Sequence, residues 1–118
     1  MKEYLEKIKV RTNEIFDDMV SLRRQIHMHP ELSEQEEQTA LLIQSRLQEL
    51  GIPFEKDIAG HGVSAVIYGK NREKGVAVRA DIDALPLKEQ TDVPFRSKID
   101  GVMHGCGHDI HTAILLGT

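Results

Sequence analysis

The sequence is poor in cysteine, in aromatic residues and in long apolar stretches, and each shortage excludes a class of protein. A single cysteine cannot form an internal disulfide, so nothing points to an oxidising compartment. No apolar run is long enough to cross a bilayer, and the charged N-terminus has no signal-peptide core. With no tryptophan and only 4% aromatic residues, the core must consist of Leu, Ile and Val. We therefore expect a cytoplasmic protein.

The chain also lacks a strong charge of either sign. Its net charge is −4 over 118 residues, with 29% charged and 40% hydrophobic residues, which is ordinary for a soluble globular protein. Such mild acidity gives no reason to expect a nucleic acid or an anionic membrane as a partner. A length of 118 residues amounts to one domain or less.

The first quarter of the chain has the periodicity of an amphipathic helix. From Lys2 to about Met28, apolar residues recur at spacings of three, four or seven and form one stripe. The stripe consists of Leu5, Ile8, Ile15, Met19, Leu22 and Ile26. Pro30 disfavours continuation of the helix. His27 and His29 do not converge on one point, because residues two apart on a helix point in different directions, and we interpret both as structural.

A second helix is predicted after Pro30. Ser33 and Glu36 match a capping box, in which a serine caps the first turn and a glutamate three residues later reaches back. Gly51 fits the position that follows a helix C-terminus. The predicted buried face consists of Ala40, Ile43, Leu47 and Leu50.

Beyond this helix the pattern becomes that of strands. Residues 54–58 predict a short strand, and residues 63–68 and 76–80 are apolar and β-branched. Strands that are apolar on both faces indicate a sheet covered by helices on each side. Residues 88–100 are polar and are interpreted as a loop.

Two carboxylates, Asp81 and Asp83, follow the third predicted strand. Ligands of open α/β sheets gather at the carboxyl ends of strands, so this position is typical of a functional site. A solvated turn before Pro86 is an equally good interpretation of the same residues.

The segment Met103–Thr112 contains three histidines, an aspartate and the single cysteine. Glycines on both sides of Cys106 let the backbone turn it and His108 toward one point. The apolar run 113–116 predicts a helix, whose N-terminus would favour a thiolate. Thiolate, imidazole and carboxylate are ligands for a divalent transition metal. The alternatives are a buried thiol, the nucleophile of a Cys–His thiol hydrolase, and chance clustering; a structural zinc knuckle would need more cysteines.

Arg79–Pro86 and Gly101–Thr112 together closely resemble the signature of the amidohydrolase branch of the co-catalytic metallopeptidases. That branch includes hippurate hydrolases, bacterial N-acyl-amino-acid amidohydrolases and plant hydrolases of auxin–amino-acid conjugates. The His-Pro-Glu-Leu run within Leu22–Leu32 also resembles the start of the family, so the resemblance covers roughly residues 20–118. It implies an α/β fold in which residues 1–118 are an N-terminal fragment of a zinc-aminopeptidase-like catalytic domain. The elements would be two helices, a mixed sheet and a helix after the Cys-x-His loop.

By this resemblance, Cys106 and His108 would bind a pair of divalent metal ions, zinc or manganese first and cobalt or nickel as alternatives. Asp81 would be the catalytic aspartate that supports the site, and Arg79 would stand where the wider superfamily has a histidine. Asp83 is the second candidate for the catalytic aspartate. Three further motif residues would orient the ligands without binding metal: His104, Asp109 and His111.

The implied reaction is hydrolysis of the amide bond of an N-acyl amino acid or a dipeptide-like substrate. Downstream of the Cys-x-His motif, relatives have a Glu-Glu pair, two further histidine ligands and an inserted domain that carries dimer contacts, and none of these follows the motif within residues 1–118. We therefore expect a homodimeric intact enzyme and an inactive isolated chain. The chief alternative is a non-catalytic metal-binding or interaction module derived from that enzyme.

Overall fold

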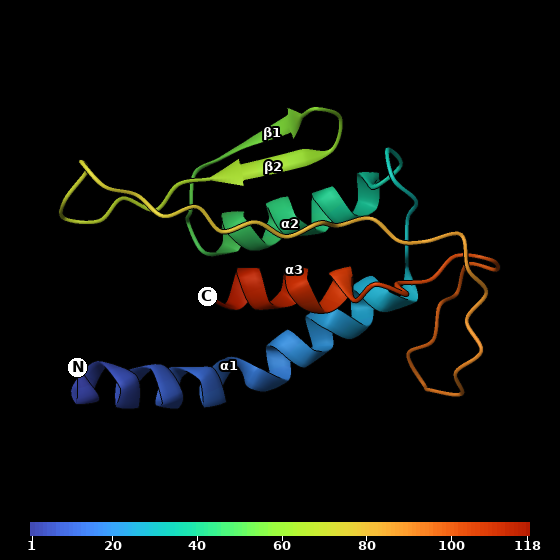
Figure 1. The fold of residues 1–118 in the computed structure, drawn as a ribbon, viewed down its shortest axis with the longest axis horizontal. Helices are drawn as coiled ribbons and strands as arrows, with labels where there is room; N and C mark the ends of the chain where they lie inside the picture. Colours follow the sequence, from blue (N-terminus) through green and yellow to red (C-terminus); the bar gives the residue numbers. More distant parts are fainter.

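The computed structural model describes all of residues 1–118. Its elements are α1 (Lys2–Met28), α2 (Glu37–Glu49), β1 (Phe54–Ile58), β2 (Gly62–Ala65) and α3 (His108–Gly117). Figure 1 shows them in layers: α3 lies between α1 and α2, and the hairpin of β1 and β2 lies beyond α2. The predicted order of two helices, a sheet and a helix after the Cys-x-His loop is therefore confirmed. None of the helices combines the length and apolar content that crossing a membrane requires.

The core forms where α3 packs on the C-terminal half of α1. Leu22, Ile26 and Ala113 are its buried centre. The residues packed around this centre are Met19, Leu42 and Leu116. Only this half of the predicted stripe is buried; Leu5 and Ile8 are exposed, which corrects the prediction. Within residues 1–118, no element packs against the first turns of α1 (Figure 1).

The start of α2 differs from the predicted capping box. The helix begins at Glu37, and neither Ser33 nor Glu36 makes a side-chain capping hydrogen bond. Instead, the carboxylate of Glu31 accepts hydrogen bonds from the backbone N–H groups of Gln38 and Thr39, at 2.9 and 2.7 Å, and from the Thr39 hydroxyl. A negative charge at a helix N-terminus is favoured by the helix dipole. The cap of α2 is thus supplied by Glu31, which lies outside the predicted capping box.

The end of α2 confirms the predicted position of Gly51 after the helix C-terminus. Gly51 has φ +67°, and its N–H donates to Gln48 O at 3.0 Å while that of Ile52 donates to Leu47 O at 2.9 Å. These are the two bonds of a Schellman motif, which glycine accommodates without strain. Leu50, predicted on the buried face, is exposed because the helix has already ended before it.

The sheet has two strands, and the third strand predicted at residues 76–80 is wrong. β1 and β2 pair antiparallel, with Phe54 opposite Ala65. Residues 76–80 run extended but have no strand partner, and Val76 and Val78 are 93% and 63% exposed. A strand exists only where a neighbour accepts its hydrogen bonds, and residues 1–118 supply no such neighbour here. The sheet is consequently not covered by helices on both sides: α2 alone lies against the hairpin (Figure 1).

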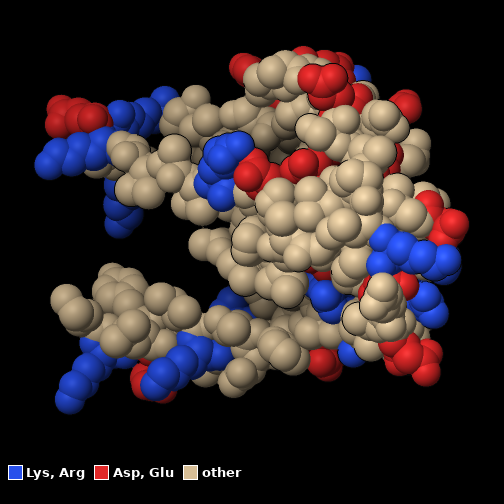
Figure 2. All heavy atoms as spheres, turned by 45° about the vertical axis from the view of Figure 1, so that its right-hand side comes forward, with Lys and Arg blue, Asp and Glu red and all other residues tan.

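Two parts of the chain project from the same side of the molecule. These are the N-terminal half of α1 and the charged segment 66–75 between β2 and the unpaired extended chain. The space-filling view shows them as two separate arms that carry most of the lysine and arginine side chains visible on that side (Figure 2). The site described next lies at the opposite end, where α3 begins.

Candidate metal centre

His108 is fixed at the start of α3 by the end of the extended chain. Its Nδ1 lies 2.9 Å from the backbone oxygen of Asp83 and 3.1 Å from the Asp83 carboxylate. Because both neighbours of Nδ1 are oxygen acceptors, Nδ1 is the nitrogen that donates to them, and Nε2 is the nitrogen left for a metal ion. An imidazole oriented in this way by a carboxylate is the form in which histidine binds metals.

Cys106 lies just before this histidine, outside the helix. Gly107 is the N-cap of α3 and has φ +85°, a left-handed conformation that other residues adopt only with strain. The thiol is free and exposed, so it is not a buried apolar side chain. The predicted place of this loop at a helix N-terminus is confirmed, and the helix begins five residues before the apolar run that indicated it.

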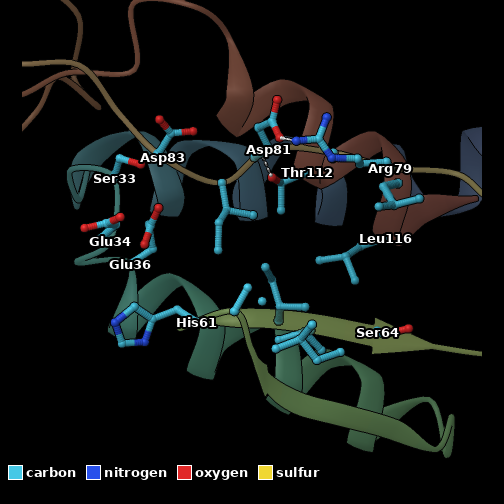
Figure 3. Close-up of a pocket in the computed structure, with 18 residues that line it drawn as sticks. Ser33, Glu34, Glu36, His61, Ser64, Arg79, Asp81, Asp83, Thr112 and Leu116 are labelled. Carbon is cyan, nitrogen blue, oxygen red and sulfur yellow. Dashed lines mark hydrogen bonds and ion pairs between the residues drawn. The ribbon is translucent and has the colours of Figure 1, made fainter.

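Asp81 and Asp83 both border a cavity of about 640 Å³ between the hairpin and α3 (Figure 3). The Asp81 carboxylate pairs with Arg79, and its backbone oxygen accepts a hydrogen bond from Thr112 at 3.2 Å. Asp83, in contrast, contacts His108 directly. The catalytic role of Asp81 remains a prediction, and the aspartate in contact with the candidate ligand is Asp83.

His104 and His111 occupy different environments. His111 is exposed on α3, with its ring centroid 5.9 Å from that of His108. His104 is buried, and neither of its ring nitrogens has a hydrogen-bond partner within residues 1–118. Burial lowers the pKa of His104, and the nearby His27 and His108 lower it further, although Asp109 opposes them. The neutral form of the buried His104 ring is therefore favoured.

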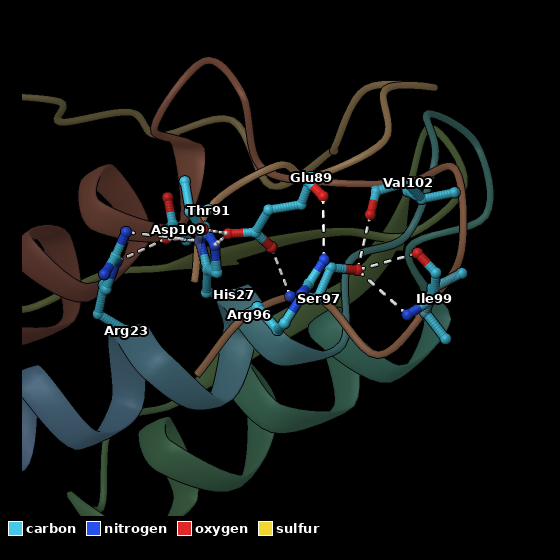
Figure 4. Close-up of polar contacts among 9 residues, drawn as sticks. All are labelled: Arg23, His27, Glu89, Thr91, Arg96, Ser97, Ile99, Val102 and Asp109. Atoms are coloured by element: carbon cyan, nitrogen blue, oxygen red, sulfur yellow. Dashed lines mark hydrogen bonds and ion pairs between the residues drawn. The ribbon is translucent and has the colours of Figure 1, made fainter. Parts of the chain in front are cut away.

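Asp109 belongs to a buried polar network that the sequence did not predict (Figure 4). Its side chain is fully buried, and one carboxylate oxygen lies 2.7 Å from Arg23 Nε and 2.8 Å from His27 Nδ1. On its other side, His27 Nε2 lies 3.0 Å from the carboxylate of Glu89. A sequence signal for part of this exists: Arg23 and His27 are four residues apart, directly beside the buried stripe of α1. Nothing in the sequence marked Glu89.

Glu89 is a buried acid held in its charged form. Burial by itself would raise its pKa, but hydrogen bonds from His27, the Ser97 backbone N–H and the Thr91 hydroxyl outweigh burial and lower the pKa to about 2. The loop 88–100, predicted as irregular, is thus organised around one ionised carboxylate.

The donors present fit part of a metal site. No three His, Cys, Asp or Glu side chains of residues 1–118 converge closely enough to hold an ion by themselves. An exposed thiol and an imidazole with a free, oriented Nε2 nevertheless stand on either side of a glycine at a helix N-terminus. This donor set suits a borderline-soft divalent ion whose remaining ligands come from elsewhere.

Comparisons with known proteins agree on one family. The model of peptidase family M20/M25/M40 matches residues 77–118. An N-acyl-L-amino acid amidohydrolase of Geobacillus stearothermophilus is 46% identical over 96% of this chain, which covers 30% of that protein. Thermostable carboxypeptidase 1 of Saccharolobus solfataricus is 46% identical over 98% of the chain, again covering 30% of the relative.

The fold agrees as well. The crystal structure of the Bacillus subtilis YxeP protein, described as a dinuclear metal binding peptidase of the M20 family, superposes with a TM-score of 0.83 at 45% identity. The match covers 88% of this chain and 30% of that one. The chain therefore spans less than a third of the length of the proteins it matches.

Proposed function

We propose a function from one premise: this chain belongs to the amidohydrolase branch of peptidase family M20/M25/M40. The intact protein hydrolyses the amide bond of N-acyl amino acids, with residues 1–118 as the N-terminal part of its metal-dependent catalytic domain. The relatives that carry an acyl-amino-acid name support the substrate class, and the carboxypeptidase relative makes short peptides the second substrate to test.

The observation that carries the proposal is the double contact of His108 Nδ1 with Asp83. It fixes the ring, its tautomer and the direction of Nε2 before any ion binds, which is the preorganisation that a catalytic metal site needs. The exposed Cys106 thiol, two residues earlier, adds a second donor on the same turn. Zinc is the first metal to test because of the thiolate, followed by manganese, cobalt and nickel, which availability in the cell can favour.

The chemistry supplied by such ions when bound is Lewis acidity, which polarises a carbonyl group and makes water more acidic. In this chain Cys106 and His108 would hold the ions, and the contacts of Asp83 with Nδ1 leave Nε2 as the ring nitrogen available to an ion. Asp81 would orient groups at the edge of the cavity once substrate displaces part of its pairing with Arg79. By the family resemblance, the carboxylate that passes a proton to the leaving amine lies outside residues 1–118.

The test compares the intact protein, its Cys106→Ser variant and the isolated chain. We expect the intact protein to hydrolyse hippurate or another N-acyl amino acid when zinc or manganese is present, and Cys106→Ser to contain less metal. The isolated chain should hydrolyse at the blank rate, because it contains too few ligands. Metal binding without hydrolysis of N-acyl amino acids or peptides would favour the non-catalytic module instead.

Alkylation of the thiol distinguishes a third possible function from the metal-dependent one. A Cys–His thiol hydrolase would lose its activity to a thiol-alkylating reagent even at full metal saturation. We expect the opposite, because a thiolate that holds a metal ion is protected by it. We further propose that the intact enzyme is a cytoplasmic homodimer, on the basis of the family resemblance and the lack of disulfide-forming cysteines.

A further inference from the structure

His27 lies in the last turn of α1 and is enclosed on every side. Its Nδ1 lies 2.8 Å from a carboxylate oxygen of Asp109, and its Nε2 lies 3.0 Å from one of Glu89. The Phe95 ring packs edge-on against it with 5.7 Å between centroids. The side chain is 6% exposed, so solvent does not compete for either nitrogen.

The ring therefore bridges two buried carboxylates, one through each nitrogen. Arg23 completes the network: its Nε donates to Asp109, and its Nη2 lies 3.4 Å from His27 Nδ1. Such a network is stable in a dry interior only when complete, because removing one member leaves a buried charge without its partner. The other titratable group near the ring is His104, whose centroid is 6.4 Å away.

This hydrogen-bonded network connects three parts of the molecule that are distant in sequence. His27 contributes the end of α1, Asp109 contributes the first turn of α3, and Glu89 contributes the loop between residues 88 and 100. The same loop is attached to α1 again by the Lys98 N–H, which donates to Met28 O at 2.9 Å. Leu85 and Met103 close its two ends by a pair of backbone hydrogen bonds.

Cys106 and His108 lie between these attachments. Met103 is fixed three residues before the cysteine, and Asp109 is fixed directly after the histidine. The turn that carries both candidate ligands is itself glycine-rich and so has little stiffness of its own. Its position therefore depends on what holds its two ends.

We propose that His27 is a positioning residue for the candidate metal ligands, acting through Asp109 and Glu89 without touching metal or substrate. This inference rests on the proposed function for the presence of metal, and on the geometry above for the role of His27. Loss of the ring frees the first turn of α3 from the loop, so that Cys106 and His108 no longer point where an ion requires them.

The test is made on the intact protein with the variants His27→Gln and His29→Gln. His29 is the matched control: it is exposed, two residues away, and its side chain bonds only to Gln25 O of its own helix. Zinc affinity is measured by titration against a chelator, at a temperature where each variant is folded. We expect the dissociation constant for zinc to rise about 10- to 100-fold in His27→Gln, which is typical of groups that orient metal ligands, and to stay unchanged in His29→Gln.

Cobalt provides a second readout that does not depend on activity. In the cobalt-loaded protein, the thiolate-to-metal absorption band reports how Cys106 meets the ion, and it should weaken or shift in His27→Gln only. If His27→Gln does not fold, Glu89→Gln replaces it and should change zinc affinity in the same direction. A variant with lower thermal stability but the zinc affinity and cobalt spectrum of the wild type would overturn the proposal.

The two proposals fail in different ways. If the wild type binds zinc tightly but hydrolyses no N-acyl amino acid or peptide, the proposed function fails while a weakened His27→Gln still supports the positioning role. If the wild type is an active amidohydrolase and His27→Gln binds zinc equally well, the positioning role fails alone. A wild type that binds no metal would overturn both.

Discussion

Asp83 and His108 are joined at two points, one through the backbone oxygen of Asp83 and one through its carboxylate. The first contact is independent of the side chain at position 83, and the second depends on it entirely. The histidine is therefore placed by the path of the chain and held in its tautomer by the carboxylate. These two contributions can be separated by substitution.

The first prediction concerns Asp83→Ala in the intact protein. The substitution keeps the backbone contact but removes the carboxylate, so the ring stays near its place with less control over which nitrogen is protonated. We expect the dissociation constant for zinc to rise about 10-fold, the lower part of the range for groups that orient metal ligands. Titration against a chelator measures the effect. Asp100→Ala, an exposed aspartate paired only with Lys88, serves as the control, and equal affinity in both variants would contradict the role assigned to Asp83.

The second prediction concerns the cap of α2. Glu31 accepts three hydrogen bonds at the start of this helix, whereas Ser33 accepts none there. Removing an ionised cap from a helix N-terminus costs about 2 kcal/mol. Glu31→Ala should therefore accelerate amide hydrogen exchange across α2, and Ser33→Ala should leave it within experimental error of the wild type. Hydrogen exchange followed by mass spectrometry on the intact protein tests both variants, and the reverse ranking would restore Ser33 as the cap.

The incorrect prediction of the α2 cap shows which features of a fold can be predicted from the sequence. Ser33 and Glu36 have the right spacing for a cap, but that pattern is local, and Glu31 caps the N–H groups of Gln38 and Thr39 from seven and eight residues away. Helical periodicity is local too, and it predicted α1 with its observed bounds and α2 to within about one turn. The strand predicted at residues 76–80 failed for the opposite reason, because a strand depends on a partner that its own residues do not specify.

The same distinction between local patterns and long-range contacts applies to the candidate site. Cys106, His108 and the two aspartates could be predicted because they belong to two short motifs. The network behind them could not, because its contacts join His27 to Glu89 across 62 residues and to Asp109 across 82. A histidine pattern on one helix contains no information about which distant carboxylates will enclose it.

The third prediction is a pH dependence that originates in Glu89. Its folded-state pKa of about 2 lies below the ordinary value of 4.5, so its ionised form stabilises the folded protein above pH 4.5. That contribution, about 3 kcal/mol, is lost as the pH falls from 4.5 toward 2. The wild type should therefore melt higher than Glu89→Gln at neutral pH, and the difference should shrink within this acidic range.

Thermal unfolding of both proteins between pH 2.5 and 7 provides the measurement. Glu55→Gln, at an exposed position of β1, should show no such convergence with the wild type. A difference between wild type and Glu89→Gln that stays constant or widens in acid would show that Glu89 does not stabilise the fold through its charge.

The last prediction concerns the unpaired extended chain. Val76 and Val78 lie on one face of a segment that has no strand partner, and Val66, Ile67 and Tyr68 before it are also exposed. Free N–H and C=O groups beside exposed apolar side chains form a template for pairing with another chain. We therefore expect residues 1–118, produced alone, to self-associate, and the double variant Val76→Lys, Val78→Lys to reduce this, because charged side chains on an edge oppose pairing.

Analytical ultracentrifugation measures the effect, and Leu41→Lys, Leu50→Lys is the matched control. Both leucines are exposed on or just after α2 and the change in charge is the same, but neither lies on extended chain. A monomeric wild-type fragment, or a control that disperses it equally well, would contradict the edge as the cause. In the intact protein the same double substitution should be unfavourable, because it should lower the stability of the fold. Relatives continue for more than twice this length, and if a later strand pairs with residues 76–80, charges placed there are buried and should destabilise the fold.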